Sequence, residues 1–485
     1  MVNLSTPRVV VAAPASGHGK TTVATGLIAA FARRGRRVAP FKVGPDYIDP
    51  GYHALAAGRP GRNLDPFLVG ECRTAGIFAH GAADADIAIV EGVMGLYDGA
   101  AGRGEFASTA QVAELIGAPV ILVVDATAQG RSVAALVDGF RGFDRRVRVA
   151  GVVLNRVGSD RHREILADAL EEIGAPLLGV LHRSDAVATP SRHLGLVPVA
   201  ERAPEALATV DALADLITEH LDLDRIERIA ASATPVAGYD PAGWSPQDAI
   251  AELGGPLVSA SGSRPVVAVA GGAAFTFSYA EHAELLAAAG AEVVTFDPLH
   301  EAKLPADTSA LVIGGGFPEV YASALAENES LVAQVRDFAA SGGVIAAECA
   351  GLLYLAKSLD GVPMCGIIDA QAAMTDRLTV GYREAVAATD SVLCDAGARM
   401  NGHEFHRTAL TPTAFADPAW LWRAHDGEKF AEGFASARLH ASYLHLHWAG
   451  TPSVPRRIVA AAVDRAVDRV VDGAPARSST VRGTP

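Results

Sequence analysis

Residues that could do chemistry first gather in a loop near the start of the chain. An apolar, β-branched run of the kind that forms a buried strand leads into this loop, which contains Gly17 and Gly19. An Ala-rich segment with a helical pattern then begins with Lys20, Thr21 and Thr22. Glycines let backbone N–H groups close around phosphate oxygens, a lysine adds positive charge, and a threonine hydroxyl can ligate Mg²⁺. The stretch therefore predicts a phosphate-binding loop between a strand and a helix.

Two carboxylates follow neighbouring strands of the same expected sheet. Asp46 comes soon after the run Val38–Lys42, and Glu91 ends the run that begins at Ile87. The carboxyl ends of parallel strands lie at one edge of a sheet, so both acids are expected beside the phosphate loop. Together with Thr21 they could supply the oxygen ligands that Mg²⁺ takes. Either acid alone could equally be a solvated loop carboxylate.

Other special residues lie on the same Gly- and Pro-rich loops. Tyr47, Asp49 and His53 stand near Asp46, and together with Glu91 they predict a substrate-binding rim. Met94 and Tyr97 lie on the second loop of this rim.

Asn155 ends a further apolar run, VVLN, which places an amide at the same sheet edge. It could hydrogen-bond an adenine ring, or it could simply form a turn. The sequence leaves both interpretations open.

The second half of the chain contains a candidate nucleophile. In GVIAAECAGLLYL a β-branched run leads to Cys349, and Ala350 and Gly351 then begin an apolar helical segment. Small flanking residues permit the sharp turn of a nucleophile elbow. A thiol at a helix N-terminus is expected to have a lowered pKa and to favour the thiolate. Cys365 and Cys394 lack this setting and are expected to be packing residues.

A cysteine nucleophile also needs a base and a place for the oxyanion. The run LHASYLHLHWAG offers His440, His445 and His447, of which the last two would face the same side of a strand. Upstream, a strand ends in three glycines, Gly314 to Gly316. Their backbone N–H groups, those of Gly315 and Gly316 in particular, could form an oxyanion hole with the N–H of Ala350.

The elements that position these residues form two α/β alternations. Residues 1–222 alternate apolar runs with helical patterns, which predicts a mainly parallel, doubly wound sheet. Residues 223–263 are rich in Pro, Gly, Ser and Ala and are interpreted as a linker with at most a short helix. A second α/β domain is expected over residues 264–472, and residues 473–485 are expected to be a disordered tail.

Composition excludes several classes of protein. The chain has 485 residues, enough for two domains, and its formal net charge of −14 argues against a nucleic-acid binder. No apolar run is long enough to span a bilayer, and no secretory signal is visible, so the expected compartment is the cytoplasm. The four cysteines show no CxxC spacing, which argues against a zinc site and against a disulfide framework.

These motifs resemble a known family. APASGHGKTT, VAPFKVGPDYIDPGYH, EGVMGLYDG and PSRHLGLVP are similar to the dethiobiotin-synthetase-like P-loop NTPase domain of cobyrinic acid a,c-diamide synthases. GGGFPE, AECAGLLYL and ASYLHLHW are similar to the flavodoxin-like class I glutamine amidotransferase domain of the same enzymes. The resemblance covers nearly the whole chain.

The resemblance implies ATP- and glutamine-dependent amidation of the a and c carboxylates of cobyrinate or hydrogenobyrinate in cobalamin synthesis. It implies that Lys20 and Thr21 hold ATP phosphates and Mg²⁺, that Cys349 is the nucleophile, and that His445 raises its reactivity. Most class I amidotransferases carry a Glu two residues after this histidine, where this chain has His447, so the third member of the site is left open. The expected partners are the corrinoid, glutamine and ATP, with no nucleic acid or membrane, and a homodimer is left open.

Two rival functions are weighed against this one. A switch ATPase of the partition type would carry an additional Lys early in the phosphate loop, and Pro14 to Gly19 contains none. That function would also leave the second domain unexplained. An amidotransferase for another carboxylated substrate is the closer rival, and either amidotransferase would lose glutaminase activity on Cys349→Ser.

Overall fold

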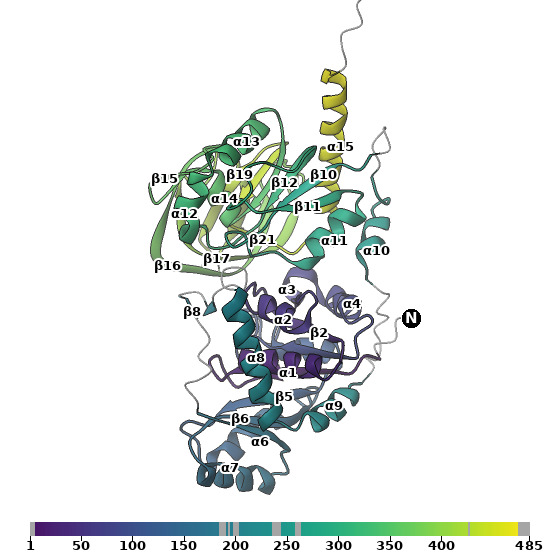
Figure 1. Cartoon of the computed structure of the whole chain (residues 1–485), viewed down its shortest axis with the longest axis vertical. Helices are drawn as coiled ribbons and strands as arrows, with labels where there is room; N and C mark the ends of the chain where they lie inside the picture. Colours follow the sequence, from purple (N-terminus) through teal and green to yellow (C-terminus); the bar gives the residue numbers. More distant parts are fainter. Residues whose placement is uncertain are drawn as a thin grey trace, which may run out of the picture.

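The computed structural model describes residues 5–183, 191–192, 195–196, 203–234, 244–257, 263–424 and 427–473. Two α/β parts lie one above the other along the longest axis of the molecule (Figure 1). The strand that leads into the phosphate loop and the strand that leads to Cys349 belong to different sheets. No helix within the described ranges is both long and apolar enough to cross a membrane.

The first part is built around a seven-stranded sheet in the order β3-β2-β4-β1-β5-β6-β7, and every neighbouring pair is parallel. Its strands are β1 (Arg8–Ala12), β2 (Val38–Val43), β3 (Arg62–Leu64), β4 (Ile87–Glu91), β5 (Val120–Asp125), β6 (Val149–Val157) and β7 (Leu177–His182). The central strands are buried on both faces, as an apolar, β-branched sequence covered by helices requires. The sequence-based prediction of a parallel, doubly wound sheet is confirmed.

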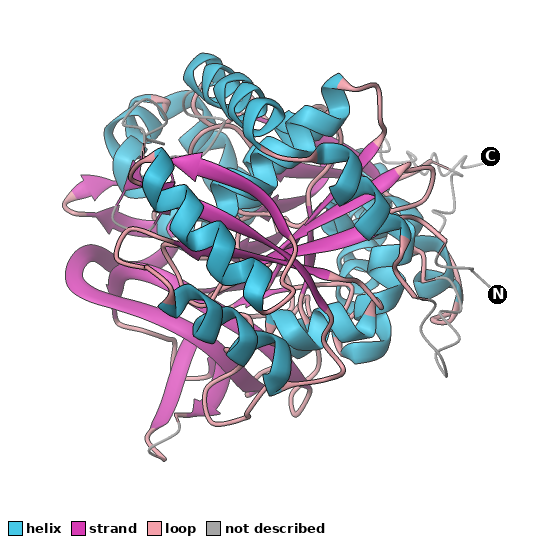
Figure 2. Ribbon diagram, turned by 90° about the horizontal axis from the view of Figure 1, so that it is seen from below, coloured by secondary structure: helices cyan, strands magenta, loops and turns pink. Residues whose placement is uncertain are grey.

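Helices cover both faces of this sheet, and Figure 2 shows them around the strands in the view from below. They are α1 (Lys20–Arg33), α2 (Asp49–Ala57), α3 (Pro66–Val69), α4 (Glu71–Gly81), α5 (Thr109–Leu115), α6 (Ser132–Phe143), α7 (Asp160–Glu172) and α8 (Ala203–His220). A short two-stranded sheet joins β8 (Ser191–Arg192) to β9 (Gly195–Leu196). The motif PSRHLGLVP, residues 190–198, extends beyond the described residues.

The segment interpreted as a linker contains two short helices, α9 (Leu223–Ala231) and α10 (Pro246–Ala251). Helix α9 packs against β1 and β4 and buries Leu223, Ile226 and Ala230. A wide apolar stripe of this kind belongs to a domain rather than to a free connection. We therefore propose that the first domain extends through α9.

The second part is built around a twelve-stranded mixed sheet. Its strands are β10 (Val266–Ala270), β11 (Glu292–Phe296), β12 (Thr308–Ile313), β13 (Val344–Glu348), β14 (Ala356–Leu359), β15 (Val362–Pro363), β16 (Ile368–Ala387), β17 (Arg399–Thr411), β18 (Pro418–Arg423), β19 (Lys429–Ala435), β20 (Leu439–Ser442) and β21 (His445–Leu446). The block β11-β10-β12-β13-β20 is parallel, whereas β16 to β19 pair antiparallel. The parallel block is the α/β core that the sequence predicts, and the long β16–β17 hairpin is an addition to it.

The helices of the second part include α11 (Ala280–Ala288), α12 (Pro318–Glu327), α13 (Glu329–Ala340), α14 (Ala350–Leu355) and α15 (Ser453–Gly473). Helix α15 packs against β10, β12 and β13. The tail expected beyond it lies outside the described residues.

Polar and aromatic contacts join the two parts. Arg62 of β3 reaches helix α11, where Nη1 lies 2.6 Å from Glu281 Oε1 and Nη2 lies 2.5 Å from Glu284 Oε1. Tyr382 of β16 donates its hydroxyl to Asp65 Oδ2 at 2.8 Å, and burial raises the pKa of Asp65 to about 6. The two halves therefore meet through specific side chains, beside α3, α4 and α11 (Figure 1).

Candidate active sites

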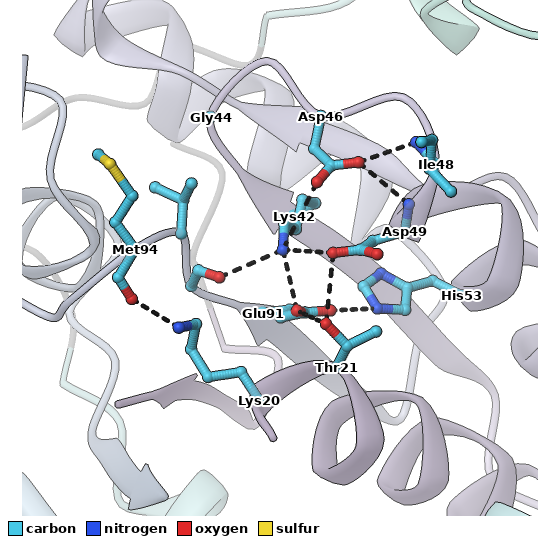
Figure 3. Close-up of polar contacts among 12 residues, drawn as sticks. Lys20, Thr21, Lys42, Gly44, Asp46, Ile48, Asp49, His53, Glu91 and Met94 are labelled. Carbon is cyan, nitrogen blue, oxygen red and sulfur yellow. Dashed lines mark hydrogen bonds and ion pairs between the residues drawn. The ribbon is translucent and has the colours of Figure 1, made fainter. Parts of the chain in front are cut away.

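The phosphate loop has the local geometry that its sequence predicts. Helix α1 begins at Lys20, and Gly19 before it adopts a left-handed conformation with φ of 96°. Lys20 Nζ donates to Met94 O at 2.6 Å and to Ala15 O at 3.1 Å, so the ammonium lies over the loop rather than in solvent (Figure 3). Burial, and then the nearby Lys42 ammonium, lower the pKa of Lys20 to about 8.

Asn155 holds this loop in place. Its Nδ2 donates to His18 O at 2.9 Å, and its Oδ1 accepts from the backbone N–H of Arg156 at 2.9 Å. A Cβ on Gly19 would lie only 2.2 Å from Asn155 Nδ2, so the loop can approach Asn155 this closely only with glycine there. These two bonds tie the amide to the loop, and its contact with adenine stays a prediction.

A buried cluster of opposite charges lies beside the phosphate loop (Figure 3). Lys42 Nζ lies 2.7 Å from Asp49 Oδ2, 2.9 Å from Glu91 Oε1 and 3.9 Å from Asp46 Oδ2. We call Lys42, Asp49 and Glu91 the Lys42 cluster. Burial alone would lower the pKa of Lys42, but the facing carboxylates outweigh it and raise this pKa.

The pKa values of the two acids of the cluster shift in opposite directions, although burial acts to raise both. For Glu91, the Lys42 ammonium outweighs burial and lowers the pKa of the carboxyl. For Asp49, burial and then the neighbouring carboxylates raise the pKa. The Lys42 ammonium lies between both carboxyl groups and favours the ionised form of each.

Sequence reasoning missed Lys42 as a site residue. The signal that could have found it is its position in VAPFKV, a run buried at all six residues. A lysine is almost never buried in such a strand without a charged partner. The two acids placed nearby on sequence grounds are therefore the partners that this lysine needs.

The oxygens around Thr21 fit a hard divalent cation. Thr21 Oγ1 lies 2.5 Å from Glu91 Oε1 and 3.4 Å from Asp49 Oδ2. Asp46 Oδ1 instead accepts from the backbone N–H groups of Ile48 and Asp49. Within the described ranges no three His, Cys, Asp or Glu side chains form a metal cage. A threonine hydroxyl and one or two carboxylates are oxygen ligands that Mg²⁺ takes, together with waters and phosphate oxygens.

The rim residues divide into two groups. His53 is fully buried, and its Nε2 lies 2.7 Å from Glu91 Oε2, so it contacts the Lys42 cluster rather than the surface. Tyr47 faces the other domain and stacks on Phe277 with ring centroids 5.0 Å apart. Met94 is 43% exposed, with φ of 47°. Tyr97 stacks on Phe140 within the first domain.

The nucleophile elbow, residues 348–351, forms at the end of β13. Cys349 has φ of 47° and ψ of −99°, a region that non-glycine residues rarely occupy, and helix α14 begins at Ala350. The backbone N–H of this strained residue donates to Ser442 O of the neighbouring strand β20 at 2.8 Å. Its Sγ lies 3.9 Å from Phe405 O of β17.

The expected lowering of the thiol pKa is wrong for this structure. Burial, and then the carboxylate of Glu319, raise the pKa of Cys349, while the backbone N–H groups of Ala350 and Gly316 act in the opposite direction. Helix α14 has only six residues, so its dipole cannot offset full burial. The resting thiol is therefore protonated and needs a base.

The glycine loop after β12 has two separate tasks. The N–H of Gly316 hydrogen-bonds to Cys349, as does that of Ala350. The N–H of Gly315 instead donates to Phe277 O at 3.2 Å, in a bridge between the two backbones. A Cβ on Gly315 would lie 2.4 Å from His445 Cε1, so this glycine makes room for the imidazole.

His445 is fully buried near the elbow. Its Nδ1 lies 3.7 Å from Glu348 Oε2, and among the described residues neither ring nitrogen has a hydrogen-bond partner. His447 points elsewhere, with Nε2 lying 3.7 Å from Glu281 Oε2. His440 lies apart from the elbow, where Nδ1 is 3.2 Å from Ser391 Oγ. Only His445 of the three lies beside the glycine loop.

Tyr47 connects the two sites. Its ring lies 5.0 Å from that of His445 and 4.9 Å from that of Tyr279, measured between centroids. Burial raises the pKa of Tyr47, with smaller contributions from Tyr279, Glu348 and Cys349. A residue of the predicted rim in the first domain therefore packs against the histidine of the second.

Comparison with known proteins finds a family match for each half of the chain. Residues 9–197 match the CobQ/CobB/MinD/ParA nucleotide binding domain, and residues 266–453 match the CobB/CobQ-like glutamine amidotransferase domain. The hydrogenobyrinate a,c-diamide synthase of Streptomyces coelicolor is 57% identical over 93% of this chain and 97% of its own. That of Thermobifida fusca is 52% identical over 94% and 96%. The cobyrinate a,c-diamide synthase of a Synechococcus species is 42% identical over 91% and 95%.

Two domains of the expected types, in the expected order, lie within relatives that align over nearly their full lengths. The switch ATPase considered above is therefore excluded, because it has no amidotransferase domain. This chain belongs to the hydrogenobyrinate and cobyrinate a,c-diamide synthase family.

Proposed function

We propose that the protein is an ATP- and glutamine-dependent ligase that converts the a and c carboxylates of hydrogenobyrinate or cobyrinate into amides during cobalamin synthesis. The observation that carries this proposal is the presence of two built sites, the phosphate loop with its Lys42 cluster and the Cys349 elbow with His445, joined at Tyr47. Identity is higher to the hydrogenobyrinate enzymes than to the cobyrinate enzymes, which favours the metal-free macrocycle.

The first site would activate the acid. A substrate carboxylate attacks the γ-phosphorus of ATP, the bond to the leaving phosphate oxygen breaks, and an acyl phosphate and ADP form. This transfer requires positioning and charge neutralisation more than covalent help from the protein. Lys20 and the loop N–H groups would supply both, with Thr21, Glu91 and Asp46 as the residues nearest a bound Mg²⁺. Mg²⁺ would neutralise charge on the phosphates.

The rim would hold the macrocycle. Asp46 and Tyr47 are only partly buried, whereas Asp49 and Glu91 are buried within the Lys42 cluster and His53 is buried beside it. We therefore assign direct substrate contact first to Asp46 and Tyr47. Asp49, His53 and Glu91 would act by holding Lys42, Thr21 and the activated acid in place.

The second site would release ammonia from glutamine. His445 takes the proton of the Cys349 thiol, the sulfur bonds to the amide carbon, and the oxyanion faces the N–H groups of Gly316 and Ala350. His445 returns the proton as ammonia leaves, and water hydrolyses the thioester to glutamate. Ammonia then attacks the acyl phosphate, and phosphate leaves as the amide forms.

The experiment compares two nitrogen sources. Wild type and Cys349→Ser are each supplied with ATP, Mg²⁺ and either hydrogenobyrinate or cobyrinate, and mass spectrometry counts the amides formed. Cys349→Ser is expected to lose glutamine-driven amidation and to keep ammonia-driven amidation. Glutamine hydrolysis by the variant, or no amide on either macrocycle with wild type, would overturn the proposal. The use of ATP and glutamine favours the cytoplasm as the compartment of this enzyme. A homodimer is a separate proposal, which analytical ultracentrifugation would test.

A further inference from the structure

The residue two places after His445 does not support it. His447 stacks on Tyr279 with centroids 4.1 Å apart, and its Nε2 faces Glu281 at 3.7 Å. Glu281 is itself held by Arg62 of the first domain. Burial lowers the pKa of His447 to about 4, so it is neutral at physiological pH and offers His445 no negative charge. Any acid that orients His445 must come from elsewhere.

Glu348 is the carboxylate that lies against His445. It is the last residue of β13, directly before the nucleophile, and its Oε2 lies 3.7 Å from His445 Nδ1. Its side chain is only 13% exposed, and within the described ranges Oε1 has no hydrogen-bond partner. A largely buried carboxylate beside a buried imidazole with no hydrogen-bond partner is costly unless the two groups interact with each other.

Strand pairing and the turn after β20 bring Glu348 and His445 close together. Glu348 pairs in register with Ser442 on the parallel strand β20. The turn that follows is fixed by Glu432, which accepts from Ser442 Oγ at 2.7 Å and from the N–H of Tyr443 at 2.8 Å. Three residues after Ser442 the chain reaches His445, which the turn has directed back toward the end of β13.

We propose that Glu348 is the positioning acid of the amidotransferase site, accepting the Nδ1 proton of His445 so that Nε2 is the basic nitrogen that receives the Cys349 proton. This inference rests on the proposed roles of Cys349 and His445. The resting distance of 3.7 Å exceeds a hydrogen bond of about 3 Å, and such contacts commonly tighten when substrate binds. Glu348 would also stabilise the imidazolium that forms while the thioester is made.

Charge alone would give Glu348 the opposite effect. Its carboxylate raises the pKa of the Cys349 thiol, as does that of Glu319 on α12. A negative charge near the sulfur opposes thiolate formation, so Glu348 can only help the reaction through the imidazole. Glu319 therefore offers a control for the charge effect, because its carboxylate also raises the pKa of the Cys349 thiol.

The test measures glutamine hydrolysis by Glu348→Gln and Glu319→Gln across about pH 6 to pH 9. Glu348→Gln is expected to lower kcat by about 10- to 100-fold with KM for glutamine little changed. The acid limb of its pH profile should move to lower pH, because His445 loses the charge that stabilises its protonated form. Glu319→Gln should not fall below wild type, and Glu348→Asp should be more active than Glu348→Gln.

Ammonia-driven amidation by the same variants reports whether the protein is folded. It should be unchanged in Glu348→Gln. If Glu348→Gln hydrolyses glutamine as wild type does, or rises in parallel with Glu319→Gln, the positioning role is wrong. Loss of kcat with no movement of the pH limb would also overturn it. These outcomes are distinct from failure of the proposed nucleophile, which would appear as glutamine hydrolysis by Cys349→Ser.

Discussion

At the scale of single residues, this enzyme depends on charges that are buried in matched sets. The Lys42 cluster holds one ammonium between two carboxylates at 2.7 and 2.9 Å. Removing one member of a buried set is costly because the others lose their compensation, even where the whole set adds little net stability. Function and stability are therefore linked at this site.

Lys42→Met should destabilise the first domain by about 3 to 5 kcal/mol. Asp49 and Glu91 would face each other without the ammonium, and ammonia-driven amidation should also fall. Differential scanning calorimetry gives the Tm of the variant. Lys357→Met is the control, since the Lys357 side chain is 61% exposed and its pair with Asp369 should contribute less than about 1 kcal/mol. Equal Tm values for the two variants would contradict the role given to the cluster.

Glu432 makes stability depend on pH. Burial raises its pKa from the usual range of a glutamic acid to about 8. A raised carboxyl pKa gives stability that is complete below the unfolded value and is lost as pH rises through the folded value. Glu432→Gln lacks this loss, so its Tm relative to wild type should rise from about pH 5 to about pH 8 and then level off. A constant Tm difference across this window would show that Glu432 does not titrate there.

At the scale of elements, short loops after parallel strands do most of the positioning. The loop after β12 supplies the N–H of Gly316 to Cys349 and the open space of Gly315 to His445. The turn after β20 returns His445 to the end of β13. Each loop is anchored to a neighbouring strand, so small local changes should move the imidazole.

Gly315→Ala should impair glutamine hydrolysis by about 100-fold, because its Cβ would lie 2.4 Å from His445 Cε1 and the ring must shift. Ammonia-driven amidation should be retained. Gly139→Ala in α6 is the matched control, since its Cβ would have nothing within 4 Å and should stabilise the helix by up to about 1 kcal/mol. Rates of glutamate formation check both variants, and an active Gly315→Ala would show that the imidazole tolerates the shift.

At the scale of the whole molecule, the interface between the two domains includes residues of both candidate sites, Tyr47 and His445. Arg62 links the first sheet to Glu281 and Glu284 on α11, and Glu281 in turn faces His447. Tyr47 extends from the loop after β2 to the ring of His445. Movement of that loop when substrate binds would therefore reach the amidotransferase site directly.

Tyr47→Leu should weaken the coupling between the two reactions. The ring that covers His445 would be lost, so more glutamine should be hydrolysed for each amide formed. The check is the ratio of glutamate to amide product under saturating ATP, measured beside Tyr47→Phe. The phenyl ring keeps the contacts with Phe277 and His445, so that variant should keep the wild-type ratio of glutamate to amide. An unchanged ratio in Tyr47→Leu would indicate that the two sites are coupled by other residues.

Much of the fold could be predicted because its signals are local. Apolar runs such as Val38–Lys42 and Val120–Val124 identify parallel strands, and helix-length patterns between them identify the covering layers. The twelve-stranded sheet was less predictable, since the antiparallel β16–β17 pair depends on register between distant segments. Alternation alone does not say which strand becomes a neighbour.

The sequence by itself determined which residue types carry the chemistry: a glycine loop with Lys20 and Thr21, acids at strand ends, and Cys349 at a strand-to-helix turn. Those assignments follow from short-range geometry, in which the order of residues fixes the backbone turn. The tertiary structure alone decided the partners, which are Lys42 between its acids, Gly315 against His445, and Glu348 rather than His447 beside the imidazole. It also reversed the expected thiol pKa. Partnership and burial depend on segments far apart in the chain that packing brings together, and no local pattern records them.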